Sequence, residues 1–184
     1  MSEVMRLLIH FHQSHYRHFK AYYTEYVQVH LRSEFPALVS YNRFVELMPT
    51  ALVALSGYLR ACYGQCMGIS FIDATSLAVC DNHRIHSHRV FDGLAKRGKT
   101  SMGWFFEFKL HVVVNDCGQL LACCLSAAIV EAINDQLKNI SQIEHTRHRS
   151  PLNFLVNLLA GLIAYCLQPK KPSPGISRQA LVLA

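Results

Sequence analysis

The hydrophobic period of the chain changes near residue 69, and this change constrains the fold more than any other feature. From Val4 to about Arg60, apolar side chains recur every three or four residues, as in amphipathic helices. Between Ile69 and Ser126 the chain is instead rich in β-branched and aromatic residues, which favour strands. Helical spacing returns after Ala127. This order predicts a mixed α/β fold (α+β), in which a small helical N-terminal unit precedes a sheet with flanking helices.

Local signals divide the helical parts. Ser40 is the expected N-cap of a helix that reaches Leu59, and Pro49 should kink or split this helix. After Ala127 a further helix has one apolar face, with Glu131 at its edge. The last helix, residues 152–168, is apolar all round but short for a bilayer, so we expect a buried core helix and no membrane partner.

Three strands are expected, over residues 69–80, 103–115 and 119–126. The sequence Asn115-Asp-Cys-Gly118 is typical of a turn, so the second and third strands should form a hairpin. Asp73 lies in the middle of the first apolar run. A buried carboxylate is costly unless a cation balances it, so Asp73 is a candidate metal ligand.

Basic residues outnumber acidic ones in this chain. Eighteen Lys and Arg against twelve Asp and Glu give a net charge of +6, and eleven His add charge below neutral pH. Such a balance favours a polyanionic partner, most often nucleic acid, although solubility alone would also explain it. Seven cysteines without a dense, even framework indicate reduced thiols in a cytoplasm, and we expect no export signal.

Two basic segments are candidates for DNA contact. The charged segment between the first two strands should be a flexible loop that suits a phosphate backbone, or else a solvated surface excursion. The basic and aromatic residues of the first helices either contact a DNA backbone or pack the helices together. The loop residues are His83, Arg84, His86, His88, Arg89, Lys96, Arg97 and Lys99, and the helical residues are His15, Tyr16, Arg17, His18, Lys20 and Tyr22.

Several strings in the chain resemble one family of mobile-element proteins. They include Phe71-Ile-Asp-Ala-Thr, Phe91-Asp-Gly-Leu-Ala-Lys-Arg-Gly-Lys-Thr-Ser-Met-Gly-Trp-Phe, Phe108-Lys-Leu-His, Ile129-Val-Glu-Ala-Ile-Asn-Asp-Gln-Leu-Lys-Asn-Ile and Gln142-Ile-Glu-His-Thr-Arg-His-Arg-Ser. Together with Tyr41-Asn-Arg-Phe-Val-Glu-Leu in the N-terminal helices, they are similar to bacterial insertion-sequence DDE transposases and, more narrowly, to the insertion-sequence 982 group.

The resemblance implies a ribonuclease H-like domain whose acidic residues hold two divalent cations, Mg²⁺ or Mn²⁺, for phosphoryl transfer to DNA. Asp73 matches the first Asp of the family's catalytic triad, and Glu131 matches its Glu. The family's middle Asp lies on a further strand that this chain lacks, because Ser126 is followed by two alanines and then directly by Ile129. At ordinary element lengths at least about 40 residues are missing. Asp116 matches a turn residue of the family and is no substitute.

The sequence therefore predicts an internally deleted, catalytically impaired DDE transposase that acts on the terminal inverted repeats of its element in a bacterial cytoplasm. Two alternatives stay open. One is a non-catalytic DNA-binding or interfering module, acting as a homo-oligomer or as a mixed oligomer with intact transposase. The other is a non-functional gene fragment.

Three regions are expected: a helical region at 1–66 that can contact DNA, a truncated ribonuclease H-like domain at 67–168, and a loose tail at 169–184. The expected DNA-binding residues are Arg84, Arg89, Lys96, Arg97, Lys99, Lys109, Lys138, Arg147 and Arg149.

Overall fold

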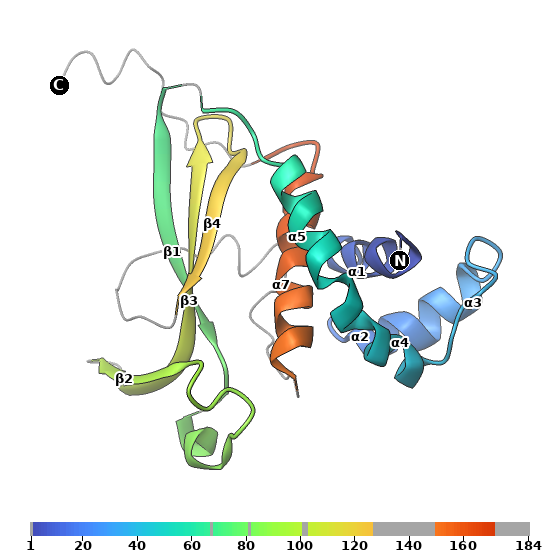
Figure 1. Cartoon of the computed structure of the whole chain (residues 1–184), viewed down its shortest axis with the longest axis horizontal. Coiled ribbons are helices and arrows are strands. Elements are labelled where there is room, and N and C mark those ends of the chain that lie inside the picture. Colours follow the sequence, from blue (N-terminus) through green and yellow to red (C-terminus); the bar gives the residue numbers. More distant parts are fainter. Residues whose placement is uncertain (1, 67, 81, 101–102, 127–149, 172–184) are drawn as a thin grey trace.

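A computed structural model of the 184-residue chain describes residues 2–66, 68–80, 82–100, 103–126 and 150–171. It combines a helical N-terminal part with an antiparallel sheet, and a long helix, α7, lies between the two (Figure 1). The mixed α/β class expected from the change of hydrophobic period is confirmed.

Short helical elements form the N-terminal part. They are α1 (Ser2–Gln13), α2 (Phe19–Ala21), the π-helix η1 (Tyr22–Val27), α3 (Gln28–His30), α4 (Tyr41–Leu47), the 3-10 helix η2 (Met48–Ala51) and α5 (Leu52–Ala61).

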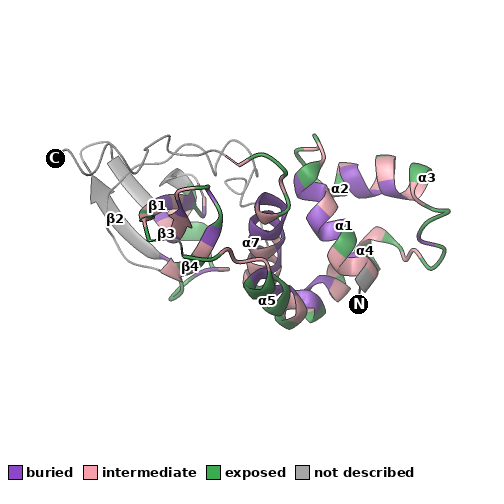
Figure 2. Ribbon diagram, turned by 90° about the horizontal axis from the view of Figure 1, so that it is seen from above, coloured by how far each residue is buried: buried purple, intermediate pink, exposed green. Residues whose placement is uncertain are grey.

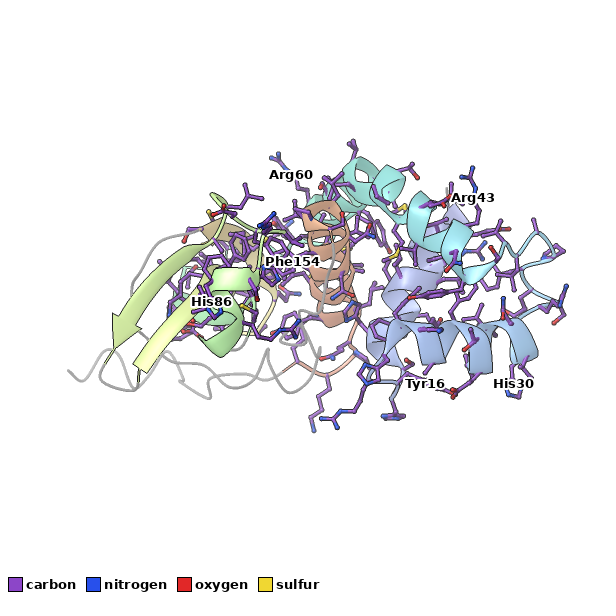
Figure 3. The ribbon with its side chains drawn as sticks, turned by 90° about the horizontal axis from the view of Figure 1, so that it is seen from below. Tyr16, His30, Arg43, Arg60, His86 and Phe154 are labelled. Carbon is purple, nitrogen blue, oxygen red and sulfur yellow. The ribbon has the colours of Figure 1, made fainter. Side chains whose placement is uncertain are left out.

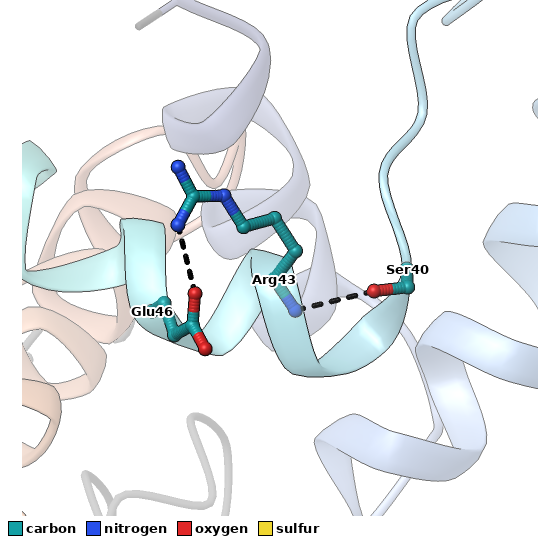
Figure 4. Close-up of polar contacts among 3 residues, drawn as sticks. All are labelled: Ser40, Arg43 and Glu46. Atoms are coloured by element: carbon teal, nitrogen blue, oxygen red, sulfur yellow. Dashed lines mark hydrogen bonds and ion pairs between the residues drawn. The ribbon is translucent and has the colours of Figure 1, made fainter.

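Both predictions for residues 41–61 are confirmed: Ser40 caps the first helix, and Pro49 splits the segment into two helices. Ser40 Oγ accepts a hydrogen bond from the backbone N–H of Arg43, with 3.4 Å between the two heavy atoms. One turn further on, the exposed Arg43 and Glu46 side chains form an ion pair of 2.8 Å (Figure 4). Pro49 lies in η2, which separates α4 from α5 because proline cannot donate a helical hydrogen bond.

The sheet is built around its longest strand. Its members are β1 (Ser70–Ala78), β2 (Lys96–Thr100), β3 (Gly103–Asn115) and β4 (Leu120–Ser126). β3 pairs antiparallel with all three others: with β2 in its first half, and with β1 and β4 on opposite sides of its second half. Gly118 adopts a left-handed φ of 71° in the turn before β4, where Asn115 Oδ1 accepts the Cys117 and Gln119 N–H groups. The predicted hairpin is thus confirmed.

The prediction of one flexible loop between the first two strands is wrong. This segment contains a 3-10 helix, η3 (Asn82–Ser87), and β2. β2 has the sequence Lys-Arg-Gly-Lys-Thr, which has no apolar alternation and gives no strand signal. It forms because β3 extends beyond the end of β4 and offers backbone partners on that side, so pairing overrides the weak strand propensity of these residues.

α7 (Pro151–Cys166) is the centre of the hydrophobic core. It packs against α1 and α5 on one side and meets the sheet on the other, and most of its residues are buried (Figure 2). The Phe154 ring lies 5.4 Å from the Phe91 ring and 5.3 Å from the Phe108 ring. At the other end of the helix, the Tyr165 hydroxyl donates to the Gly118 carbonyl over 2.7 Å. The predicted core helix is confirmed.

Polar contacts also connect α7 to the N-terminal helices. His12 Nε2 of α1 lies 3.1 Å from Asn157 Oδ1 of α7. Ser150 caps the helix by accepting a hydrogen bond from the Asn153 N–H group. Among the helices of the described residues, none combines the length and the apolar character needed to cross a bilayer.

Truncation of Phe154 to alanine should destabilise the fold by about 3–5 kcal/mol, because its ring fills the junction between α7 and the sheet. Leu152→Ala is the matched control on the same helix, since Leu152 is 48 % exposed and should cost less than about 1 kcal/mol. Urea denaturation followed by circular dichroism measures both. Equal losses in the two variants would contradict the central position of α7.

Candidate functional site

Asp73 lies on the covered face of the sheet but is only half-buried. The side chains of Phe71, Asp73, Thr75 and Leu77 share one face of β1, and burial along this face is complete only from Thr75 onward. The expectation of a fully buried carboxylate is therefore wrong. In the second half of β1, Leu77 is part of the buried hydrophobic core. The first half of the same face stays partly exposed to water.

Among the described residues, the Asp73 carboxylate has a backbone group as its hydrogen-bond partner. Asp73 Oδ1 accepts a hydrogen bond from the N–H of Ala74 over 2.7 Å. In the sheet register Asp73 stands opposite Val112, and Val112 stands opposite Cys123. Directly opposed residues share a face, so the row across the sheet consists of one carboxylate, one valine and one thiol.

The other carboxylate on the described strands points away from Asp73. Glu107 pairs with Ala78 and so lies on the opposite face of the sheet. There it accepts a hydrogen bond from Ser76 Oγ over 3.0 Å and lies 3.9 Å from Lys109 Nζ. The sequence analysis missed this polar group, although the alternation of Glu107 and Lys109 within an apolar strand could have indicated it.

The described residues therefore do not fit a two-metal centre. No group of three or more His, Cys, Asp or Glu side chains within the described parts of the chain could hold a metal ion. Glu131, the second expected ligand, lies outside the described residues. Asp116 lies in the turn between β3 and β4, as expected.

Tyr63 and three thiols lie between the sheet and the helices. Tyr63 Oη lies 3.3 Å from Cys123 Sγ, and burial together with this thiol raises the pKa of Tyr63 to about 12. Burial, with the nearby Cys62 thiol, raises the pKa of Cys166 to about 11. A thiol with a raised pKa stays protonated and weakly nucleophilic near neutral pH, so Cys166 is suited to packing.

The expected DNA-binding residues occupy different environments. Arg84 and Arg89, in and just after η3, are exposed, and so is His86, which lies at the sheet end of the molecule (Figure 3). Lys96, Arg97 and Lys99 lie on β2. Three further expected residues fall outside the described parts of the chain: Lys138, Arg147 and Arg149.

Among the expected DNA-binding residues whose burial is described, which are Arg84, Arg89 and Lys109, the least exposed is Lys109. It is 7 % exposed and faces Glu107, so its ammonium group has a local counter-charge. A lysine in this position is poorly placed to contact a phosphate directly. The burial of its side chain argues for a structural role within the sheet.

The aromatic residues of the first helices pack against one another. The Phe11, Phe19, Tyr22 and Tyr23 rings form a continuous set of contacts that reaches Phe44 of α4. Of the two interpretations of this segment, packing is therefore observed for the aromatic rings. The basic residues between them remain exposed, at His15, Arg17, His18 and Lys20.

Comparison with known families supports the assignment of the strand-bearing part. A family model described as a transposase DDE domain matches residues 63–128 and, in a second segment, residues 126–151. The match spans just under half of the chain and supports a DDE-type transposase. Proteins of this type act on DNA with divalent metal ions. No curated protein and no solved structure matches the chain.

A single carboxylate holds a divalent cation weakly, so Mn²⁺ held by Asp73 without a second carboxylate should bind with a dissociation constant on the order of millimolar or weaker. Loss of the electron paramagnetic resonance signal of free Mn²⁺ measures the binding. Asp73→Asn should change it less than about twofold, and Glu107→Gln is the matched control on the opposite face of the sheet. Micromolar binding that is lost in Asp73→Asn would show that further residues complete the site.

Proposed function

We propose that this chain is an internally deleted derivative of a bacterial insertion-sequence transposase, similar to the insertion-sequence 982 group, that binds DNA but does not carry out strand transfer alone. One observation carries the proposal. The two segments matched by the transposase family model meet at residues 126–128, immediately after β4 ends at Ser126. The resemblance to the family predicts the loss of the strand bearing the middle Asp at this same junction.

The surroundings of Asp73 support the loss of catalysis. A two-metal mechanism needs several carboxylates to balance the charge of the cations and fix their positions. Asp73 shares its row of the sheet with Val112 and Cys123, and Glu107 lies on the other face. Removal of one member of a cooperative catalytic set commonly lowers the rate by about 10³- to 10⁶-fold.

The charge distribution supports the retention of DNA binding. Arg84 and Arg89 are exposed at the sheet end, and the chain as a whole carries a charge of +6. Such residues contact phosphates without reading sequence. A protein that binds the terminal inverted repeats without joining them would compete with an intact transposase for the same ends, so an interfering role follows from the same features.

In a strand-transfer assay with the element's terminal inverted repeats and Mg²⁺ or Mn²⁺, the purified chain should show less than about 10⁻³ of the activity of an intact transposase. Asp73→Asn should leave this background unchanged, because Asp73 without the middle Asp does not fix two cations in place. The intact protein from a full-length copy of the element is the positive control. Robust joining by the chain alone would refute the proposal.

Replacement of both Arg84 and Arg89 by glutamine should weaken binding to the terminal repeat by about tenfold at moderate salt. It should also reduce the slope of log K against log[salt] by about 2, since each arginine that contacts a phosphate contributes about one unit. Fluorescence anisotropy with labelled duplex measures both quantities. Arg43→Gln is the matched control, because Arg43 is an exposed arginine of the helical part that is already paired with Glu46 (Figure 4). An unchanged salt slope in the double variant would exclude this segment as the DNA contact.

A further inference from the structure

Part of the aromatic cluster of the first helices reaches the surface as a row of rings. The Tyr26 ring contacts Tyr16 and His30, with ring centroids 6.1 Å and 5.4 Å apart, and it stacks on His10 at 5.8 Å. Tyr16 and Tyr26 are half-buried, and His30 is exposed. Figure 3 shows Tyr16 and His30 along one side of the helical part. This row of rings offers a surface on which a further planar group can stack.

A cleft lies beside the row of rings. It has a volume of about 500 Å³ and lies between α1, the turn after α3, and α5. His10 belongs to both features, because its ring stacks on Tyr26 and also lines the cleft. Other parts of the wall are apolar, as at Ile9, Leu31 and Phe35. A cleft of this size is in the range that holds small organic groups.

The polar side chains of the cleft suit a neutral, planar group with hydrogen-bond donors and acceptors. The Arg6 guanidinium lies over the Phe35 ring, 5.1 Å from its centroid, and a guanidinium stacked in this way still donates hydrogen bonds from its edge. Gln13 adds an amide to the wall, and Glu34 adds a carboxylate. Since the wall carries both signs of charge, it does not favour an anion. Arginine, glutamine and glutamate are side chains with which proteins contact the edges of nucleobases.

The chain around the rings is basic. From His10 to Arg32 the sequence contains one acidic residue, Glu25, against three Lys and Arg and five His. Arg17, Lys20 and Arg32 are all exposed. Cationic side chains attract the phosphates of a nucleic acid backbone, and aromatic rings beside them stack on its bases. This combination is typical of proteins that bind single-stranded nucleic acid.

We propose that the helical part binds single-stranded nucleic acid, with unpaired bases stacked on the row of rings and one base inserted in the cleft. The phosphates of the same strand contact Arg17 and Lys20. The site selects single strands because a base within a duplex is stacked and paired, and neither a ring nor the cleft can reach it. This site is separate from the duplex contact proposed for Arg84 and Arg89 and goes beyond the proposed function.

Fluorescence anisotropy of the full chain with short labelled strands tests the site. A single strand that carries bases should bind at least about tenfold more tightly than an abasic strand of the same length, because the phosphates are the same and only the stacking is lost. Tyr26→Leu should remove most of this difference while it keeps apolar bulk in the cluster. Tyr41→Leu, at a half-buried tyrosine of α4 outside the cleft lining, is the matched control and should leave the difference unchanged.

Two variants at exposed positions keep the test decisive if Tyr26→Leu does not fold, and a cooperative thermal melt verifies the folding of each. Gln13→Ala should weaken binding several-fold and change the preference among the four bases. Arg17→Gln combined with Lys20→Gln should reduce the slope of log K against log[salt] by about 1.4, because each phosphate contact on a single strand contributes about 0.7. Parallel series with DNA and RNA strands distinguish the two sources of the ligand, and the proposal requires the abasic difference in at least one.

The single-strand site and the duplex contact fail independently. Replacement of Arg84 and Arg89 should weaken duplex binding and keep the abasic difference, whereas Tyr26→Leu should do the reverse. Equal binding of base-bearing and abasic strands, or equal effects of Tyr26→Leu and Tyr41→Leu, would overturn the proposal. Binding to vesicles of anionic lipid without binding to either kind of strand would also overturn it and would assign the basic surface to a membrane.

Discussion

The fold depends on the packing of α7 between the N-terminal helices and the antiparallel sheet. The helices of residues 2–61 are short, and their aromatic rings form a cluster. α7 packs against two of these helices, α1 and α5. The same helix supplies Phe154 to the aromatic contacts below the sheet and Tyr165 to the turn between β3 and β4. A helix covered on both sides must be apolar around its whole circumference, and this explains its composition without any membrane.

The two faces of the sheet separate its charged groups. Asp73 and Glu107 lie on neighbouring strands, yet strand alternation places their carboxylates on opposite faces. Asp73 accepts a backbone N–H and shares its row of the sheet with Val112 and Cys123, while Glu107 forms a local polar group with Ser76 and Lys109. The same alternation directs the backbone of Ala74 to the edge of β1 with which no other described strand pairs. One strand register thus separates the two carboxylates and fixes the neighbours of each.

Much of the secondary structure could be predicted because the local signals were strong. The apolar periods located the helices and three strands, Ser40 and Pro49 marked a cap and a break, and Asn115–Gly118 marked the turn. β2 could not be found in this way, because its strand state comes from pairing with β3 and not from its own residues. Asp73 was recognised as a candidate from its position in an apolar run, but its degree of burial depends on which half of β1 the other elements cover.

The sequence by itself determined the order of the described elements, the buried character of α7 and the resemblance to DDE transposases. These properties follow from period, composition and local strings, which are readable one segment at a time. Only the tertiary structure decided that Asp73 binds the N–H of Ala74, that Glu107 faces away from it, that Lys109 is buried and that β1 has a free edge among the described strands. These properties depend on strand register and on contacts between distant segments, which no local pattern encodes.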